Sequence, residues 1–104
     1  MAALPACVLA GTVLCALASA TTAAAADLHN GRQVYRAYCA SCHGPTGVAV
    51  MPGAPNFARG DRLIQPDAGL LASIRGGRNA MPAFAGVLRD REILDVIAFL
   101  RTMR

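Results

Sequence analysis

The stretch Cys39-Ala40-Ser41-Cys42-His43 decides how the rest of this chain folds. Two cysteines separated by two residues and followed directly by a histidine form the attachment signature of a c-type haem. Each thiol adds across one vinyl group of the porphyrin, and the two-residue gap lets both sulfur atoms reach one edge of the macrocycle. The neutral imidazole of the next residue then lies under the iron, where it is a good axial ligand. The motif predicts one covalently attached haem c, bound through Cys39 and Cys42, with His43 on the iron.

A bare CxxC pair has three other interpretations: a thioredoxin-like redox pair, half of a zinc site, or a disulfide. The adjacent His43 favours haem, and no second CxxC or histidine cluster completes a zinc site. A haem-free CxxC thiol oxidoreductase is the enzyme-class alternative. A thioredoxin-type role calls for a βαβ context, which this sequence lacks.

Met81 is the predicted sixth ligand, opposite His43. A thioether is a soft neutral ligand that favours Fe(II) over Fe(III). Met81 precedes Pro82, which stiffens its loop, and that loop lies between two predicted helices. Met51 is the rival ligand, but it follows His43 so closely that we expect it to pack on the histidine side. Of the remaining candidate ligands, we expect a surface or core position for Met103 and a solvated side chain for His29.

The first 26 residues carry no charge. An apolar stretch from Leu4 to Leu17 precedes several small residues, which is the shape of a secretory signal peptide with an A-x-A-like cleavage site. We expect cleavage after Ala26, with Ala20 as the second choice. Residues 1–26 are then the signal peptide and residues 27–104 the haem-binding domain. Because the first residues lack Lys and Arg, an uncleaved membrane anchor is the alternative.

All of the charge lies after the predicted signal peptide, where ten Arg and no Lys stand against six Asp and Glu, giving a net charge of +4. This excess is too small to indicate nucleic acid binding, and no basic stretch is interleaved with aromatic residues. It suits a redox partner with an acidic docking face. A mature chain this short buries little core, and a covalently bound haem would compensate for that.

Hydrophobic periodicity predicts three main helices and no strand alternation. The first helix is capped by Asp27 and runs into Cys39. The second begins at Pro66 and Asp67 and ends at Gly76-Gly77. The third is capped by Asp90, and Arg101 and Arg104 favour the dipole at its C-terminal end. Residues 44–61 and 78–87 are expected to be loops.

After residue 26 the chain resembles the small single-haem cytochromes c of class I. The motifs that carry the resemblance are the Gly31…Tyr35…Cys39 spacing, Cys39 to Gly44, Ala54 to Phe57, Asn79 to Pro82, and Asp95 to Leu100. The resemblance implies an all-α fold, with three to four short helices wrapped around one haem.

More narrowly, the chain is similar to the small periplasmic cytochromes encoded beside the haem-c, haem-d nitrite reductase of denitrifying bacteria. This implies a monomeric electron carrier rather than an enzyme, located in the periplasm, without stable membrane insertion after cleavage. The implied partners are a nitrite reductase and an upstream cytochrome or quinol-oxidising complex. A haem-containing maturation factor for the nitrite reductase or its haem is the alternative.

The resemblance also implies roles for residues outside the motif. Gly31 would let the first and last helices meet at right angles, and Tyr35 would pack against the last helix near Val96 and Phe99. The Pro55 carbonyl would accept the Nδ1–H of the axial histidine.

Polar residues near the expected haem have implied roles as well. Asn79 would hydrogen-bond near the axial sulfur. Four arginines are candidates for the haem propionates, of which at least two are expected to be solvated: Arg59, Arg62, Arg75 and Arg78.

Overall fold

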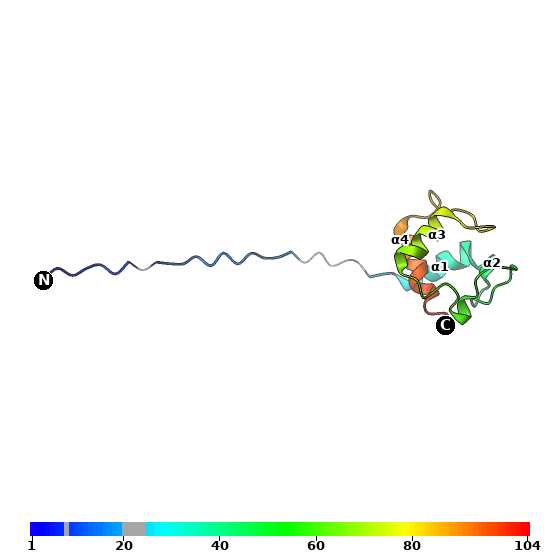
Figure 1. Cartoon of the computed structure of the whole chain (residues 1–104), viewed down its shortest axis with the longest axis horizontal. Helices are drawn as coiled ribbons and strands as arrows, with labels where there is room; N and C mark the ends of the chain where they lie inside the picture. The colour runs from blue at the N-terminus through cyan, green and yellow to red at the C-terminus, as the bar shows by residue number, and fades with distance from the viewer. Residues whose placement is uncertain (8, 20–24) are drawn as a thin grey trace.

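The computed structural model describes residues 1–7, 9–19 and 25–104. Its helices follow in the order α1 (Leu28–Tyr38), α2 (Ala40–His43), the 3-10 helix η1 (Phe57–Arg59), α3 (Asp67–Gly76) and α4 (Asp90–Leu100). Figure 1 shows the helices gathered at the C-terminal end of the chain. Within the described residues the only β-type pairings are two isolated bridges. The all-α prediction is therefore confirmed.

Helices α1 and α4 pack directly on each other at Gly31. A Cβ atom at Gly31 would overlap the backbone carbonyl oxygen of Asp95 and lie 3.1 Å from the Cβ of Phe99. Only glycine lets the two backbones come this close, as the sequence predicts. One turn further along α1, the ring of Tyr35 lies 5.5 Å from that of Phe99 at a 60° tilt, so its predicted packing is also confirmed.

The starts of α1 and α4 differ in how well the sequence predicts them. The Asp27 carboxylate accepts the Asn30 N–H at 3.0 Å and caps α1 as expected. Helix α4, however, has Arg89 as its N-cap rather than Asp90. The Glu92 carboxylate accepts the Arg89 N–H at 3.2 Å, as in a capping box. The cap is therefore one residue earlier than predicted, and Asp90 is the first residue of the helix.

Arg101 does not serve the dipole of α4, which corrects a sequence-based expectation. Its guanidinium reaches the start of α3, where it bonds Asp67 Oδ1 at 2.6 Å. It also donates to the carbonyls of Leu63 at 2.5 Å and Gln65 at 3.1 Å. Three acceptors on one neighbouring segment outcompete the last carbonyls of its own helix, because a guanidinium presents several donors in one plane.

The predicted loop of residues 44–61 contains the short helix η1, which the sequence reading missed. Asn56 caps it by accepting the Arg59 N–H at 3.2 Å. Gly60 then ends it in the left-handed conformation, with φ of +84°. The boundaries of α3 match the prediction, since the helix ends at Gly76 and Gly77 has φ of +74°.

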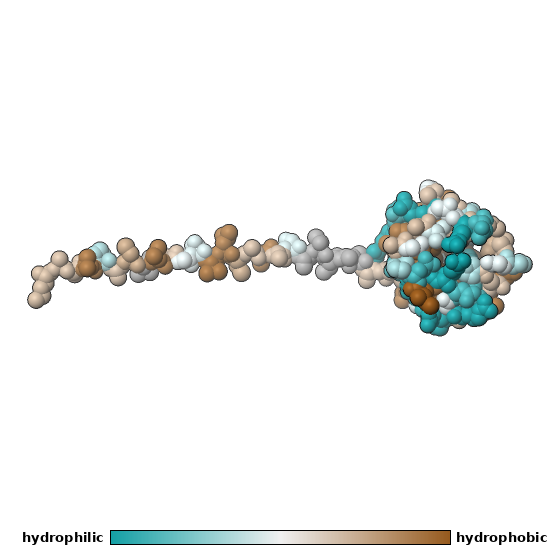
Figure 2. Space-filling model, in the orientation of Figure 1, coloured by the Kyte–Doolittle hydropathy of each residue, from teal (hydrophilic) through white to brown (hydrophobic). Residues whose placement is uncertain are grey.

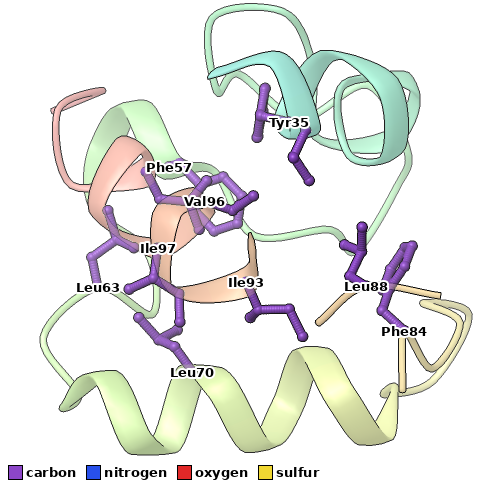
Figure 3. Packing of buried hydrophobic residues seen from close by; sticks show 11 residues of the cluster. Tyr35, Phe57, Leu63, Leu70, Phe84, Leu88, Ile93, Val96 and Ile97 are labelled. Atoms are coloured by element: carbon purple, nitrogen blue, oxygen red, sulfur yellow. The ribbon is translucent and has the colours of Figure 1, made fainter. Parts of the chain in front are cut away.

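The core is built mainly from α4 and the segments that face it. Figure 3 shows Leu63, Leu70 and Ile97 meeting between α3 and α4. Phe84 and Leu88, from the loop after α3, extend the same cluster. The largest completely buried side chains are those of Tyr35, Ile93 and Ile97.

Residues 1–7 and 9–19 are exposed and form no helix or strand. Figure 2 colours this segment as largely hydrophobic and the visible face of the helical part as largely hydrophilic. Among the described residues, no helix is long and apolar enough to cross a membrane. Of the two predicted cleavage positions, Ala26 is described, whereas Ala20 lies outside the described residues. The signal peptide remains a prediction.

Candidate functional site

The CxxCH motif lies where α1 passes into α2. Cys39 is both the C-cap of α1 and the N-cap of α2, and Cys42 and His43 belong to α2. The amides of Cys42 and His43 both bond the Cys39 carbonyl, at 3.2 Å and 3.0 Å. Both cysteines are half-buried and carry free thiols. One short helical turn therefore holds the two sulfur atoms and the imidazole together.

The His43 ring is buried and fixed on two sides. Its Nδ1 lies 3.3 Å from the Pro55 carbonyl oxygen, which is the contact that the resemblance implies. The Phe57 ring stacks on it, with centroids 4.6 Å apart and planes at 25°. Burial lowers the pKa of His43, although the Pro55 hydrogen bond opposes this shift. A neutral imidazole that donates from Nδ1 keeps the lone pair of Nε2 for a metal.

The residues after the motif fold back onto it, and we call residues 39–57 the histidine segment. The Tyr35 hydroxyl donates to the Gly44 carbonyl at 2.6 Å from α1. Burial, with a smaller contribution from Cys39, raises the pKa of Tyr35 to about 12, so this donor keeps its proton. The Met51 N–H bonds the Cys42 carbonyl at 3.0 Å, which places its backbone beside the motif, as expected. Its side chain, however, is exposed rather than packed.

Met81 lies in the loop between α3 and α4, and we call residues 77–88 the methionine strap. The backbones of Arg78 and Met81 exchange two hydrogen bonds, of 3.0 Å and 2.9 Å. These bonds close a two-residue turn in which Asn79 takes the left-handed conformation, with φ of +53°. Met81 is half-buried and packs against the hydrophobic core.

The structure gives Asn79 a backbone role, and the hydrogen bond near the axial sulfur that the resemblance implies stays a prediction. Asn79 provides the left-handed turn position that brings Met81 back towards α3, and its side chain is exposed. Asn tolerates this conformation better than most residues. The sequence does not predict the turn geometry of the Asn79-Ala80 pair.

Two of the four arginines considered for the propionates are engaged with carboxylates. Arg59 pairs with Asp61 at 3.0 Å and Arg75 with Asp90 at 3.3 Å, both on the surface. Arg62 has φ of +66° in the loop before α3. Arg78 is exposed and flanks the turn that carries the strap methionine.

The remaining candidate ligands lie where the sequence places them. His29 is exposed, and its Nε2 lies 3.1 Å from Gln33 Nε2. Met103 is half-buried and packs against the core.

The Cys39 thiol does not have the character of a redox-active nucleophile. Burial, together with Cys42, raises the pKa of Cys39 to about 11. Thioredoxin-type catalysis needs the opposite shift, because the thiolate is the nucleophile. Within residues 1–7, 9–19 and 25–104, no group of three or more His, Cys, Asp or Glu side chains is placed to hold a metal ion. The zinc interpretation therefore lacks a ligand set there.

Comparison with known proteins identifies the family. A family model described as "Cytochrome C oxidase, cbb3-type, subunit III" matches residues 26–100. Cytochrome c6 of Thermosynechococcus vestitus is 42% identical over 89 residues, which span 81% of this chain and 78% of the relative. The chain belongs to the class I cytochrome c family. Cytochrome c6 of Nostoc sp. is 35% identical over 97 residues, covering 89% of this cytochrome and 86% of the relative.

The fold agrees with this family. The structure of cytochrome c6 from the diatom Phaeodactylum tricornutum superposes with a TM-score of 0.56 at 33% identity, covering 73% of this cytochrome and 92% of that chain. This cytochrome is accordingly a monohaem c-type electron carrier and not an enzyme. That finding excludes the thiol oxidoreductase interpretation.

The residues on α1 and α2 fit a covalent haem. Two unpaired, half-buried thiols are open to addition, and a buried neutral imidazole lies one residue beyond them. Sequence reasoning missed two contacts of this site, one on the imidazole and one on the neighbouring Gly44 carbonyl. Phe57 belongs to one of the family motifs, but the motif does not reveal that its ring stacks on His43. The Tyr35 bond to Gly44 has a backbone acceptor, which leaves no trace in the sequence.

Proposed function

We propose that this cytochrome, after export to the periplasm, carries single electrons through one haem held by Cys39, Cys42, His43 and Met81. The observation that carries the proposal is the His43 imidazole, which is buried and oriented through Nδ1 by the Pro55 carbonyl at 3.3 Å. A haem iron, when bound, supplies reversible one-electron chemistry between Fe(III) and Fe(II).

Each of the four residues has a distinct role. Cys39 and Cys42 would form thioether bonds, each S–H adding across one vinyl group of the haem. The haem could then not dissociate between rounds of electron transfer. His43 Nε2 and Met81 Sδ would hold the iron. With both of these side chains bound to the iron, no site on it would be open to a substrate, as a carrier requires.

For the electron acceptor we propose a dissimilatory nitrite reductase, with an upstream cytochrome or quinol-oxidising complex as donor. The support is the resemblance to cytochromes encoded beside that enzyme, together with the net charge of +4, which suits an acidic docking face. The matching family model bears the name of an oxidase subunit, so a terminal oxidase is the alternative acceptor. A maturation factor for the nitrite reductase is the alternative role.

The first experiment tests haem attachment on protein exported by a host that makes c-type cytochromes. Intact mass should show one added haem, and acid–acetone should leave it on the chain. Cys39→Ser and Cys42→Ser should each keep the haem through one remaining thioether, whereas the double variant should release it. Haem that acid–acetone extracts from the unmodified protein would overturn covalent attachment.

The second experiment identifies the acceptor. The reduced protein is mixed with nitrite reductase or with a terminal oxidase at two salt concentrations, and its oxidation is followed by absorbance. Rapid oxidation by nitrite reductase that slows with salt supports the proposed acceptor, because salt screens the charges that steer docking. Oxidation by the oxidase alone assigns the alternative acceptor. A reductase that lacks haem when made without this cytochrome supports the maturation role.

A further inference from the structure

Asp95 is the most deeply buried acidic side chain of the helical part, and it lies at the crossing of α1 and α4. Its side chain is 4% exposed, while its backbone carbonyl faces Gly31. A buried carboxylate needs hydrogen-bond donors and an opposite charge to be stable. The donors that face the Asp95 carboxylate therefore indicate which group it binds.

Three nitrogen atoms surround the Asp95 carboxylate. The backbone nitrogen of Asp27 lies 2.8 Å from Oδ1, and Asn30 Nδ2 lies 2.9 Å from Oδ2. Arg91 Nε is further away, 3.6 Å from Oδ1. The nearest donor on Oδ1 is thus the backbone nitrogen that begins the predicted mature chain.

We propose that hydrolysis of the Ala26–Asp27 bond turns this nitrogen into an ammonium group that forms a buried ion pair with Asp95. Water adds across the peptide bond, so Ala26 leaves as a carboxylate and Asp27 gains an amine, which takes up a proton. This inference rests on the export that the proposed function includes. It assigns Asp95 as the receptor for the mature N-terminus.

The surroundings change in step with this cleavage. In the uncut chain the Arg91 guanidinium donates to the Ala25 carbonyl, which departs with the signal segment. The new ammonium is closer to Oδ1 than Arg91 Nε is, so it becomes the nearest cation to the carboxylate. Removal of the signal segment therefore strengthens the contact between α1 and α4, and it does so only after export.

The charged groups around the new amine set its protonation. The Asp27 carboxylate already caps α1 through Asn30, and α4 contributes Asp95 and Arg91. Glu92 lies near Asp95 as well, but it is paired with Arg89 at 3.2 Å. The two carboxylates of Asp27 and Asp95 outnumber the one guanidinium of Arg91, so the surroundings favour the charged amine over the neutral one.

The test uses the complete absence of Lys, which leaves the N-terminal amine as the only primary amine of the mature polypeptide. An acetyl N-hydroxysuccinimide ester therefore removes only that charge from the haem-loaded protein. Acetylation should lower the melting temperature by about 4–8 °C, the range that a loss near 1 kcal/mol produces in a domain this small. In Asp95→Asn, which keeps an acceptor oxygen without the charge, the same treatment should lower it by less than half as much. An equal loss in both proteins would overturn the ion pair.

A second comparison does not depend on the folding of Asp95→Asn. Haem-loaded protein engineered to begin at Ala26 has an amide at Asp27 again, with its ammonium one residue away. It should melt about 4–8 °C below protein that begins at Asp27, and equal melting temperatures would overturn the proposal. N-terminal sequencing of naturally exported protein should read Asp27, and any other start overturns the processing step. The haem spectrum reports separately on the proposed function.

Discussion

The histidine segment and the methionine strap present the two predicted axial ligands in different ways. His43 is fixed by residues at the other end of its own segment, since the Pro55 carbonyl and the Phe57 ring both orient its imidazole. Tyr35, from α1, adds a hydroxyl bond to the neighbouring Gly44 carbonyl. Met81 is positioned mainly by its own turn, whose two backbone bonds connect it to Arg78.

This difference shows how the two ligands would respond to change. A side chain fixed by several independent contacts keeps its orientation when one contact is lost, whereas one set by a local turn depends on that turn. Beyond the turn, the strap is joined to α3 by Phe84 N–H to Ile74 O at 3.0 Å and Ala85 N–H to Arg75 O at 3.1 Å. We therefore expect perturbations to reach the iron more easily through the strap.

The largest effect is expected for Met81→Ala. The free energy of unfolding should fall by about 2 kcal/mol from lost packing alone, the low end for Met→Ala, because the side chain is half-buried. Losing the thioether should also abolish the weak near-infrared sulfur-to-iron absorption band and lower the reduction potential. Absorption spectroscopy and redox titration measure both, and carbon monoxide should then bind the reduced protein at neutral pH.

Met51→Ala is the matched control, because it removes the same side chain from the histidine segment. The band and the potential should stay close to those of the unmodified protein. If Met51→Ala abolishes the band while Met81→Ala keeps it, Met51 is the sixth ligand and the assignment of Met81 is wrong. Carbon monoxide binding by the unmodified reduced protein would show that the sixth position is open.

An intermediate effect is expected for Tyr35→Phe, which removes a hydrogen bond to Gly44, the residue that follows the histidine. The Gly44 carbonyl loses the 2.6 Å hydroxyl bond but still accepts the Gly47 N–H at 3.3 Å. The free energy of unfolding should therefore fall by only about 1 kcal/mol, measured by denaturant titration. The potential should hardly change, and a large drop would contradict the redundancy of the histidine contacts. Tyr38→Phe, at an exposed ring, is the control and should stay within about 0.5 kcal/mol.

Alkaline pH tests the same contact without mutation. The pKa of Tyr35 is raised from its ordinary value of 10.0 to about 12, so the folded chain keeps a proton that the unfolded chain loses. This stabilisation is fully present below pH 10 and is lost as pH rises towards 12. Thermal unfolding between pH 9 and 12 should show a steeper decline for the unmodified protein than for Tyr35→Phe.

The smallest effect is expected for Asn79→Gly in the strap. Glycine adopts the left-handed conformation of this position, φ of +53°, without a side-chain penalty. The free energy of unfolding should change by less than about 0.5 kcal/mol, because Asn already tolerates this region and glycine only adds freedom to the unfolded chain. Asn79→Ala should cost about 1 kcal/mol by comparison. A sulfur-to-iron band that moves more in Asn79→Ala than in Tyr35→Phe would support the greater sensitivity of the strap.

The sequence alone determined the parts of this cytochrome that depend on short-range chemistry. The CxxCH spacing identified the cofactor, Asp27 identified the start of α1, and Gly76-Gly77 identified the end of α3. Each of these signals lies within a few residues of what it specifies. The close packing of α1 on α4 at Gly31 was also predictable, through the family resemblance.

Tertiary structure alone decided which groups meet across the chain. The Tyr35 hydroxyl bonds a backbone carbonyl, Arg101 leaves its own helix for α3, and Asp95 holds the backbone nitrogen of Asp27. Side-chain patterns do not encode these partners, because every residue except Pro offers the same backbone N–H and C=O. A particular pair meets only when the packing of the helices brings its two atoms within hydrogen-bond distance.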